Sequence, residues 1–508
     1  MKCNKLLTGI TAFITAAALV LLPSCKAEND TETTTDTAAY EQTTEQETPL
    51  GIISVPYTSL DSLSPFYTKS TLNSALTSLL YRSLYVLDAG FEPTADMATD
   101  AQVNGTTVTV SLNADMRFSD DSYLSADDVV YSFNKAKSSY LYSQSLKNVS
   151  GCVSSGKLTV TFTLASADVN VLSVLTFPIV RNGSAESADV IPTGSGRYYV
   201  QVGELRTNLL CNMNYNGDIA GIGTIRLVDV NDSSSVNHML TTGEIDCYFS
   251  DLSDGSAERT YANVNEVYLN ELVYIGINAG DFPLNNADMR KALSFACDRS
   301  EIADNAFQSH ARTTEVPFNP SWTPITETKE SIYSASLGGT TAANTLLKTL
   351  GYGTDGNSLT LRLLYMDTGT FIRNTATVIS ELLSKVNITV ELVAAEEDDY
   401  ISKLKSGDFD LYLGDVKLTA NMDLSGFFDD DGAFSYGIPT ELSVRTKYAQ
   451  YKAGTESLDA FLRSFNESEP FIPLLFRNGR FCYSRNITGT IEVTAGNLYG
   501  TIDKWKCG

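Results

Sequence analysis

The chain contains few of the side chains that perform acid–base or metal chemistry. It has two histidines, His238 and His310, which are far apart in the sequence, and no H-E-x-x-H pair. Zinc hydrolysis and histidine-based triads are therefore disfavoured, and we predict no catalytic residue, no metal ligand and no cofactor. Residues 151–157 have P-loop spacing, but Leu158 stands where a Ser or Thr is required, so we interpret the match as chance.

Cys25 has the most definite chemistry in the sequence. Lys2 and Lys5 precede an apolar run that ends at Pro23, and residues 1–24 contain no acid. The small Ser24 directly before Cys25 resembles the lipobox that a lipoprotein signal peptidase cleaves, the alternative being a secretory signal with a chance cysteine. We predict a signal peptide over 1–24, palmitate-type acyl chains on Cys25 and an acidic, Thr-rich tether over 25–50. Two acyl chains would anchor the protein stably on the extracytoplasmic face of the cell membrane.

Charge and composition exclude a nucleic-acid partner and predict a large core. The chain has 36 basic and 61 acidic residues, whereas binding to a phosphate backbone needs clustered cations. Hydrophobic residues make up 43% of the chain, and its length suits about three domains or two large lobes. No C-x-x-C pair occurs in the chain. Several of the six cysteines other than Cys3 and Cys25 are expected to be small buried hydrophobes, and their disulfide pairing stays open. These cysteines are Cys152, Cys211, Cys247, Cys297, Cys482 and Cys507.

The residue periodicity predicts a mixed α/β fold. Residues 106–112 and 157–164 are typical of strands, and Ser125 with Asp128 forms a capping box for a helix that follows. The second half alternates strand and helix, which predicts a parallel sheet with right-handed crossovers. The predicted elements are a helix over 342–350, a strand over 359–365, a helix over 372–385, a strand over 388–393, a helix over 399–405 and a strand over 409–414.

Seven sequence blocks, in order along the chain, resemble motifs of one protein family. The most specific is 116–133, which reads M-R-F-S-D-D and then L-S-A-D-D-V-V-Y-S-F. The other blocks are 60–65 (L-D-S-L-S-P), 80–84 (L-Y-R-S-L), 192–198 (P-T-G-S-G-R-Y), 214–215 (N-Y), 242–246 (T-G-E-I-D) and 289–299 (M-R-K-A-L-S-F-A-C-D-R). The chain thereby resembles the solute-binding proteins of family 5, the oligopeptide, dipeptide and nickel-type receptors of ABC importers.

The resemblance implies an α/β fold of two lobes, of the periplasmic-binding-protein type II class, with an extra subdomain in the first lobe. Lobe I would comprise 51–272 with a return over 478–508, and lobe II would comprise 273–477. The ligand would lie in the cleft between the lobes, which close by a hinge motion. Charged residues of the blocks are expected to be structural, at helix ends, rather than ligand contacts. They are Asp127, Asp128, Arg290, Asp298 and Arg299.

The resemblance also implies a function without covalent chemistry. We expect a monomeric substrate-binding lipoprotein that captures a peptide or a similar small polar solute. It would deliver this ligand to the transmembrane permease subunits of an ABC importer, which a separate ATPase energises. The alternatives are a non-transport surface protein on the same fold (a chaperone, sensor or adhesin) and a receptor for a non-peptide solute.

One set of candidate ligand-binding residues follows a predicted lobe-II strand. Peptide receptors of the family carry there an Asp that meets the ligand's α-ammonium, a position that falls on Thr419 or Ala420 in this sequence. Asp415 and Asp423 are the nearby acids that could replace it, and Asp423 is alternatively a match to a later acid of the family pattern. Recognition of a free amine therefore stays open. The candidates in this segment are Asp415, Val416, Lys417, Thr419, Asn421 and Asp423.

A second set is aromatic. A tyrosine offers a flat apolar face and a polar tip, which suits varied ligands, although packing in the core is the alternative for each ring. Three candidates flank the 60–65 block in lobe I, and three lie near predicted strand ends in lobe II. They are Tyr57, Phe66 and Tyr67, and Tyr274, Tyr365 and Phe371.

Overall fold

The computed structural model describes residues 51–508 apart from 219–220, 256, 334–337 and 355. The predicted signal peptide, Cys25 and the tether therefore lie outside the described residues. None of the described helices is both long and apolar enough to cross a membrane.

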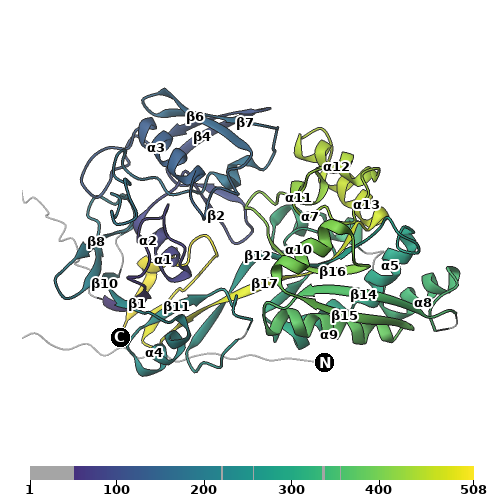
Figure 1. Ribbon diagram of the computed structural model, residues 1–508. Coiled ribbons are helices and arrows are strands. Elements are labelled where there is room, and N and C mark those ends of the chain that lie inside the picture. The colour runs from purple at the N-terminus through teal and green to yellow at the C-terminus, as the bar shows by residue number, and fades with distance from the viewer. Residues whose placement is uncertain (1–50, 219–220, 256, 334–337, 355) are drawn as a thin grey trace, which may run out of the picture. The chain divides into compact units, whose positions relative to one another are not determined.

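The N-terminal part of the fold is built on two four-stranded sheets around one core (Figure 1). The first consists, in spatial order, of β1 (Gly51–Tyr57), β10 (Ile222–Asp229), β9 (Thr207–Cys211) and β8 (Tyr198–Val202). The second consists of β4 (Ala98–Asn104), β5 (Thr107–Leu112), β7 (Thr159–Leu164) and β6 (Val149–Gly156), all antiparallel. The rings of Phe133, Phe162 and Phe177 meet edge to face, with centres 5.8 to 6.5 Å apart, and anchor this core.

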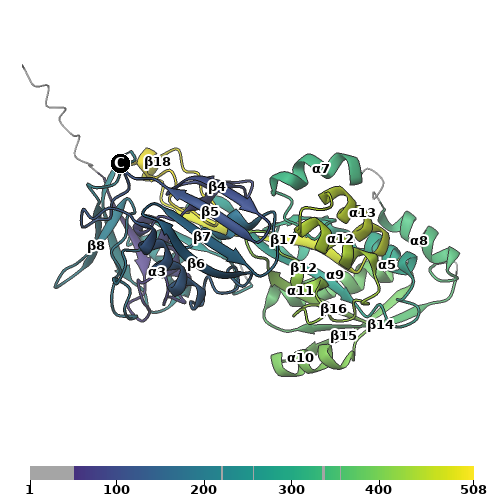
Figure 2. The same ribbon diagram turned by 90° about the horizontal axis from the view of Figure 1, so that it is seen from above.

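A seven-stranded sheet forms the other part of the fold, with helices on both faces (Figure 2). Its strands are β11 (Cys247–Ser250), β17 (Phe471–Tyr483), β12 (Asn263–Ile277), β16 (Leu411–Lys417), β14 (Leu359–Met366) and β15 (Ile388–Ala395), with β13 (Ala311–Thr313) beside β17. One face packs on α5 (Ala287–Ala296), α6 (Arg299–Phe307), α8 (Gly339–Thr349) and α9 (Thr370–Ser384). The other packs on α7 (Thr323–Tyr333), α10 (Glu397–Ser406), α11 (Ser425–Phe428), α12 (Ser443–Lys452) and α13 (Leu458–Ser468).

Alternation along each strand explains these two faces. Successive side chains of a strand point to opposite sides, so Leu411 and Leu413 enter one core while Tyr412, between them, enters the other. β14 pairs in parallel with both β15 and β16, as the strand–helix alternation predicted. Gly351 and Gly407 follow α8 and α10 with φ of 83° and 72°, the left-handed conformation that ends a helix.

The two long strands β12 and β17 connect the two parts of the fold (Figure 1). They pair antiparallel, with register shifts between Tyr268 and Leu272 and between Val273 and Tyr274. Val267 and Phe481 belong to the first core, whereas Val273 and Leu475 belong to a core of the large sheet. The predicted lobe boundaries, 272/273 and 477/478, fall inside these two strands and stay a prediction.

Asp128, Arg290 and Asp298, three of the charged residues expected to be structural, bond to the backbone. The Asp128 carboxylate accepts the Ser125 amide at 2.8 Å, which is the return half of the predicted capping box at the start of α3 (Ala126–Lys137). Buried Arg290 donates to the carbonyls of Leu284 and Glu469. Asp298 caps α6 by accepting the amides of Ser300 and Glu301. All six described cysteines are free thiols, and Cys152, Cys247, Cys297 and Cys482 are buried.

Candidate functional site

The site is a cavity of 680 Å³ with walls from both parts of the fold. One wall comes from the short helices α1 (Thr71–Ala75) and α2 (Thr77–Leu80), the strand β2 (Tyr85–Leu87), which pairs with β3 (Pro93–Ala95), and the C-terminal segment 493–500. The opposite wall comes from residues 266–271 of β12 and from residues 417–420. Some smaller elements lie outside these walls: α4 (Val236–Thr242), β18 (Ile487–Gly489), β19 (Trp505–Cys507) and the β8–β9 hairpin.

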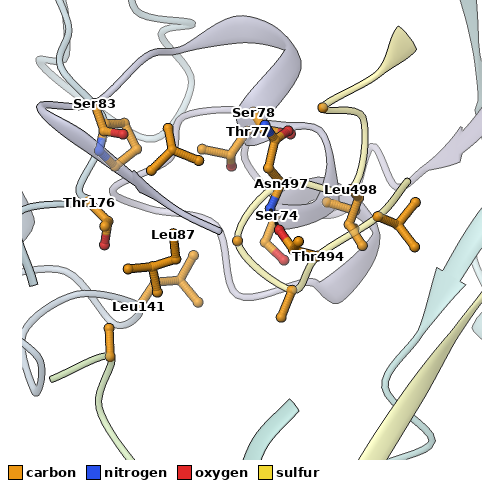
Figure 3. Close-up of a pocket in the computed structure, with 18 of the residues that line it drawn as sticks. Ser74, Thr77, Ser78, Ser83, Leu87, Leu141, Thr176, Thr494, Asn497 and Leu498 are labelled. Atoms are coloured by element: carbon orange, nitrogen blue, oxygen red, sulfur yellow. Dashed lines mark hydrogen bonds between the residues drawn. The ribbon is translucent and has the colours of Figure 1, made fainter. Parts of the chain in front are cut away.

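Hydroxyl and amide groups line part of the first wall, beside apolar side chains such as Leu87, Leu141 and Leu498. Figure 3 shows Ser74, Thr77 and Ser78 beside Thr494 and Asn497, which come from opposite ends of the sequence. Hydroxyl and amide groups both donate and accept hydrogen bonds. This wall therefore suits polar ligands without requiring one charge.

Asp61 fixes the start of α1. Its carboxylate accepts the amides of Lys69 and Ser70 at 2.7 Å and the Thr68 hydroxyl at 2.8 Å. Burial alone would raise the pKa of Asp61, but these hydrogen bonds outweigh burial and hold it below its usual value. The 60–65 block therefore positions the helix that carries Ser74 into the wall.

A group of two arginines around one tyrosine ring also lines this wall. The guanidinium groups of Arg82 and Arg197 lie 5.2 and 5.0 Å from the ring centre of Tyr215. Arg82 is paired with Asp96, and Arg197 with Asp503 at 3.2 Å. Both arginines line the cavity with their charges already neutralised by protein groups.

The segment 417–420 is held in the second wall by a chain of hydrogen bonds. Asn270 donates to the carbonyl of Thr419 at 3.0 Å, and the Thr419 hydroxyl donates to the Asn421 side chain at 2.6 Å. Asn421 in turn donates to the carboxylate of Asp168, also at 2.6 Å. Burial raises the pKa of Asp168, against the nearby charge of Lys452, which lowers it. Lys417 and Thr419 thus line the cavity, whereas Asn421 is buried behind them.

The two acids near this segment do not line the cavity. Asp415 pairs with Arg477 at 3.0 Å, and burial raises its pKa against that arginine. Asp423 accepts Lys452 and the Tyr448 hydroxyl, each at 2.8 Å. Burial opposes ionisation of Asp423, but Lys452 prevails and holds its pKa below the usual value. The positions expected for the amine-binding Asp, Thr419 and Ala420, lie in the wall without a carboxylate.

Most of the aromatic candidates lie in the cores. Phe66, Tyr365 and Phe371 are buried, and Phe371 packs on Phe307 with ring centres 5.0 Å apart. Tyr57 and Tyr67 are half-buried against the first core. Buried Tyr274 packs edge to face on Tyr412, Phe427 and Phe471 and, with Asp415, borders a separate cavity of 310 Å³. None of these six rings lines the 680 Å³ cavity, and the buried neighbour of Lys417, Val416, does not line it either. Their binding of a ligand stays a prediction.

Several lining residues were not among the sequence candidates. Ser74, Thr77 and Ser78 belong to a Ser/Thr-rich stretch directly after the 60–65 block, and their density was an available signal. Glu271 offered a second signal, because this acid directly precedes the mostly apolar residues 272–277 of β12. Nothing in the sequence indicates that residues 494 and 497 reach the same wall.

The histidines do not form a metal site in the described part of the chain. The His310 ring nitrogen Nδ1 lies 2.9 Å from the carboxylate of Glu266, which lines the cavity. Among the described residues, no group of three or more His, Cys, Asp and Glu side chains could hold a metal ion.

An α/β protein of two sheet-based parts, joined by paired strands, has the architecture of periplasmic solute-binding proteins. The structure of a putative peptide-binding protein, AppA, from Clostridium difficile superposes with a TM-score of 0.70 over 90% of this chain and 100% of that chain, at 17% identity. The two-lobe fold expected from the sequence is thereby confirmed.

The sequence places the chain within that class. The profile of the bacterial extracellular solute-binding proteins, family 5 (middle), matches residues 92–430, and the chain belongs to this family. It is 23% identical to the nickel-binding periplasmic protein of Escherichia coli (strain K12), over 65% of this chain and 69% of that protein. It is 25% identical to the oligopeptide-binding protein OppA of Bacillus subtilis (strain 168), over 43% of this chain and 42% of that protein. The chain is therefore a binding protein rather than an enzyme.

Proposed function

We propose that this chain is the lipid-anchored, extracytoplasmic substrate-binding protein of an ABC importer. It captures a peptide or a similar small polar solute in the 680 Å³ cavity. The observation that carries this proposal is the lining of that cavity, where hydroxyl and amide groups of one wall face the Thr419 segment of the other. Its volume lies in the range of about 300–1,000 Å³ that is common for small-ligand sites.

The two walls suggest how binding is signalled to a permease. A ligand that contacts residues of α1 and α2 and also residues 417–420 stabilises the state in which both walls approach it. The paired strands β12 and β17 are the covalent links about which such an approach can occur. A permease would then recognise the ligand-bound arrangement of the two lobes.

The relatives support a peptide or peptide-like solute without fixing it. One is named an oligopeptide-binding protein and another a nickel-binding protein. The Ser, Thr and Asn side chains of the cavity can bond the donors and acceptors of a peptide backbone. We therefore favour a ligand with many amide groups.

Native mass spectrometry of residues 26–508 with a tripeptide library tests this proposal. Ser74→Trp would place an indole in the cavity and compete with bound ligand, whereas Ser155→Trp, at an exposed site in β6, would leave binding unchanged. We expect wild type and Ser155→Trp to retain peptides and Ser74→Trp to retain at least tenfold less. Equal retention by the two variants would show that the ligand binds elsewhere.

A further inference from the structure

A cluster of charged residues lies where the crossing strands reach the cavity. Glu271 of β12 and Asp415 of β16 both bond one nitrogen atom of Arg477, Nη1, at 3.1 and 3.0 Å. The other terminal nitrogen of Arg477 donates to the Leu252 carbonyl at 2.9 Å. One Arg477 side chain is therefore shared between two carboxylates.

The cluster carries more negative than positive charge. Lys417 stands opposite Glu271 in the strand register, and Asp251, at the end of β11, also acts on the Glu271 carboxylate. Three carboxylates thus face two cations. Burial raises the pKa of Glu271, and the nearby Asp415 and Asp251 raise it further, while Arg477 and Lys417 lower it. Arg477 and Lys417 therefore do not fully balance the negative charge around the Glu271 carboxylate.

The surplus charge faces the cavity rather than the core. Glu271, Asp251 and Lys417 line the cavity, whereas Arg477 and Asp415 lie behind them. Among the described residues, three other cations line the cavity, and all belong to the first wall. Arg82 and Arg197 pair with their own aspartates, and Lys69 lies just before α1. A ligand placed near Thr419 therefore meets an acidic patch supplied by the crossing strands.

We propose that Glu271, with Asp251 beside it, receives a cationic group of the ligand, a primary ammonium or a guanidinium. The inference rests on the proposed function and names the charge of its ligand. Arg477 shares its one positive charge between Glu271 and Asp415. A cationic group of the ligand would add a second positive charge beside Glu271. Lys417 competes with that cation, because it faces the same carboxylate.

Three probe sets test the proposal on residues 26–508 by native mass spectrometry: a tripeptide library with free amino termini, the same library after N-acetylation, and a mixture of putrescine, agmatine and spermidine. The tripeptides contain no Lys, Arg or His, so acetylation removes their positive charge. We expect retention of free-amine tripeptides to exceed that of acetylated ones by at least tenfold. Glu271→Gln should abolish this preference, and Lys417→Met should increase it.

Glu391→Gln is the matched control, since this exposed acid of β15 does not line the cavity. Equal retention of free and acetylated peptides by wild type would overturn the proposal. The proposal would also be overturned if Glu271→Gln kept the preference for free-amine tripeptides while melting at the wild-type temperature. Retention of the amines without any peptide, lost in Glu271→Gln, would uphold Glu271 and overturn the peptide class. Retention of none of the probes would overturn the cationic ligand, while cavity binding of an uncharged solute would remain open to the Ser74→Trp comparison.

Discussion

Glu469 is a buried carboxyl at the end of α13, and only 7% of the residue is exposed. Its backbone carbonyl accepts Arg290, and its side chain interacts with Ser294. Burial raises the pKa of Glu469 to about 7, because Ser294 and the nearby Arg299, Lys291 and Arg290 offset only part of the desolvation. This one side chain should therefore titrate near neutral pH, unlike the exposed acids that dominate the sequence.

The sign of the resulting pH effect follows from proton linkage. The folded state holds the Glu469 proton more tightly than the unfolded chain, so the contribution of Glu469 to stability falls as pH rises from 4.5 to about 7. We expect the unfolding free energy of wild type to decrease over this range relative to Glu469→Gln, by on the order of 1–3 kcal/mol. Urea unfolding of both proteins at several pH values measures the difference. The exposed Glu467→Gln is the control, and parallel profiles for wild type and Glu469→Gln would contradict the prediction.

At the scale of elements, the turn 194–196 shows why one sequence block requires glycine. The Gly196 amide donates to the carbonyl of Leu80 at 3.0 Å, so the turn lies directly on the backbone of α2. A Cβ at Gly196 would lie 2.3 Å from the Leu79 carbonyl oxygen, and a backbone atom has little freedom to move away. The turn therefore fixes the depth of the helix that carries Thr77 and Ser78 into the cavity wall.

Gly196→Ala should destabilise the protein by roughly 3 kcal/mol, because the new methyl group overpacks a backbone contact. Gly151→Ala in β6 is the matched control, since a Cβ there meets nothing within 4 Å, and it should stay within about 0.5 kcal/mol of wild type. Urea unfolding measures both. Similar unfolding midpoints for the two variants would show that α2 and the turn can separate at little cost.

Local patterns predicted the elements of the large sheet better than its connections. Ile372, Ala376, Ile379 and Leu383 recur at helical spacing, and all four are buried in α9. The parallel order of β14, β15 and β16 followed from the same alternation. The pairing of β12 with β17 did not, because these strands are far apart in the sequence and their register depends on packing in both cores.

At the scale of the whole molecule, the cavity was predictable only in part. Lys417 and Thr419 were found because the family resemblance places ligand contacts after the predicted strand over 409–414, and both line the cavity. Phe66 and Phe371 were chosen by residue type, but large rings gain most from close packing, and both lie in cores. The cavity joins segments near residues 74, 271, 418 and 497, which only the tertiary fold brings together.

At the same scale, the proposed attachment to a membrane rests on the sequence of residues 1–50. We expect Cys25→Ala to lose labelling by an alkyne analogue of palmitate and to keep an uncleaved N-terminus, because the modified thiol and the cleavage site are removed together. Cys3→Ala changes a cysteine within the predicted signal peptide, so it should be labelled and processed like wild type.

The informative readouts are the label and the intact mass, since an uncleaved precursor would stay in the membrane through its apolar run and would confuse simple fractionation. Label on Cys25→Ala would contradict lipidation at this residue. An unlabelled wild-type protein that is cleaved and released would support a secretory signal instead. The solute-binding fold would be unaffected by either result, because it lies within residues 51–508, but capture at the membrane surface would then need another anchor.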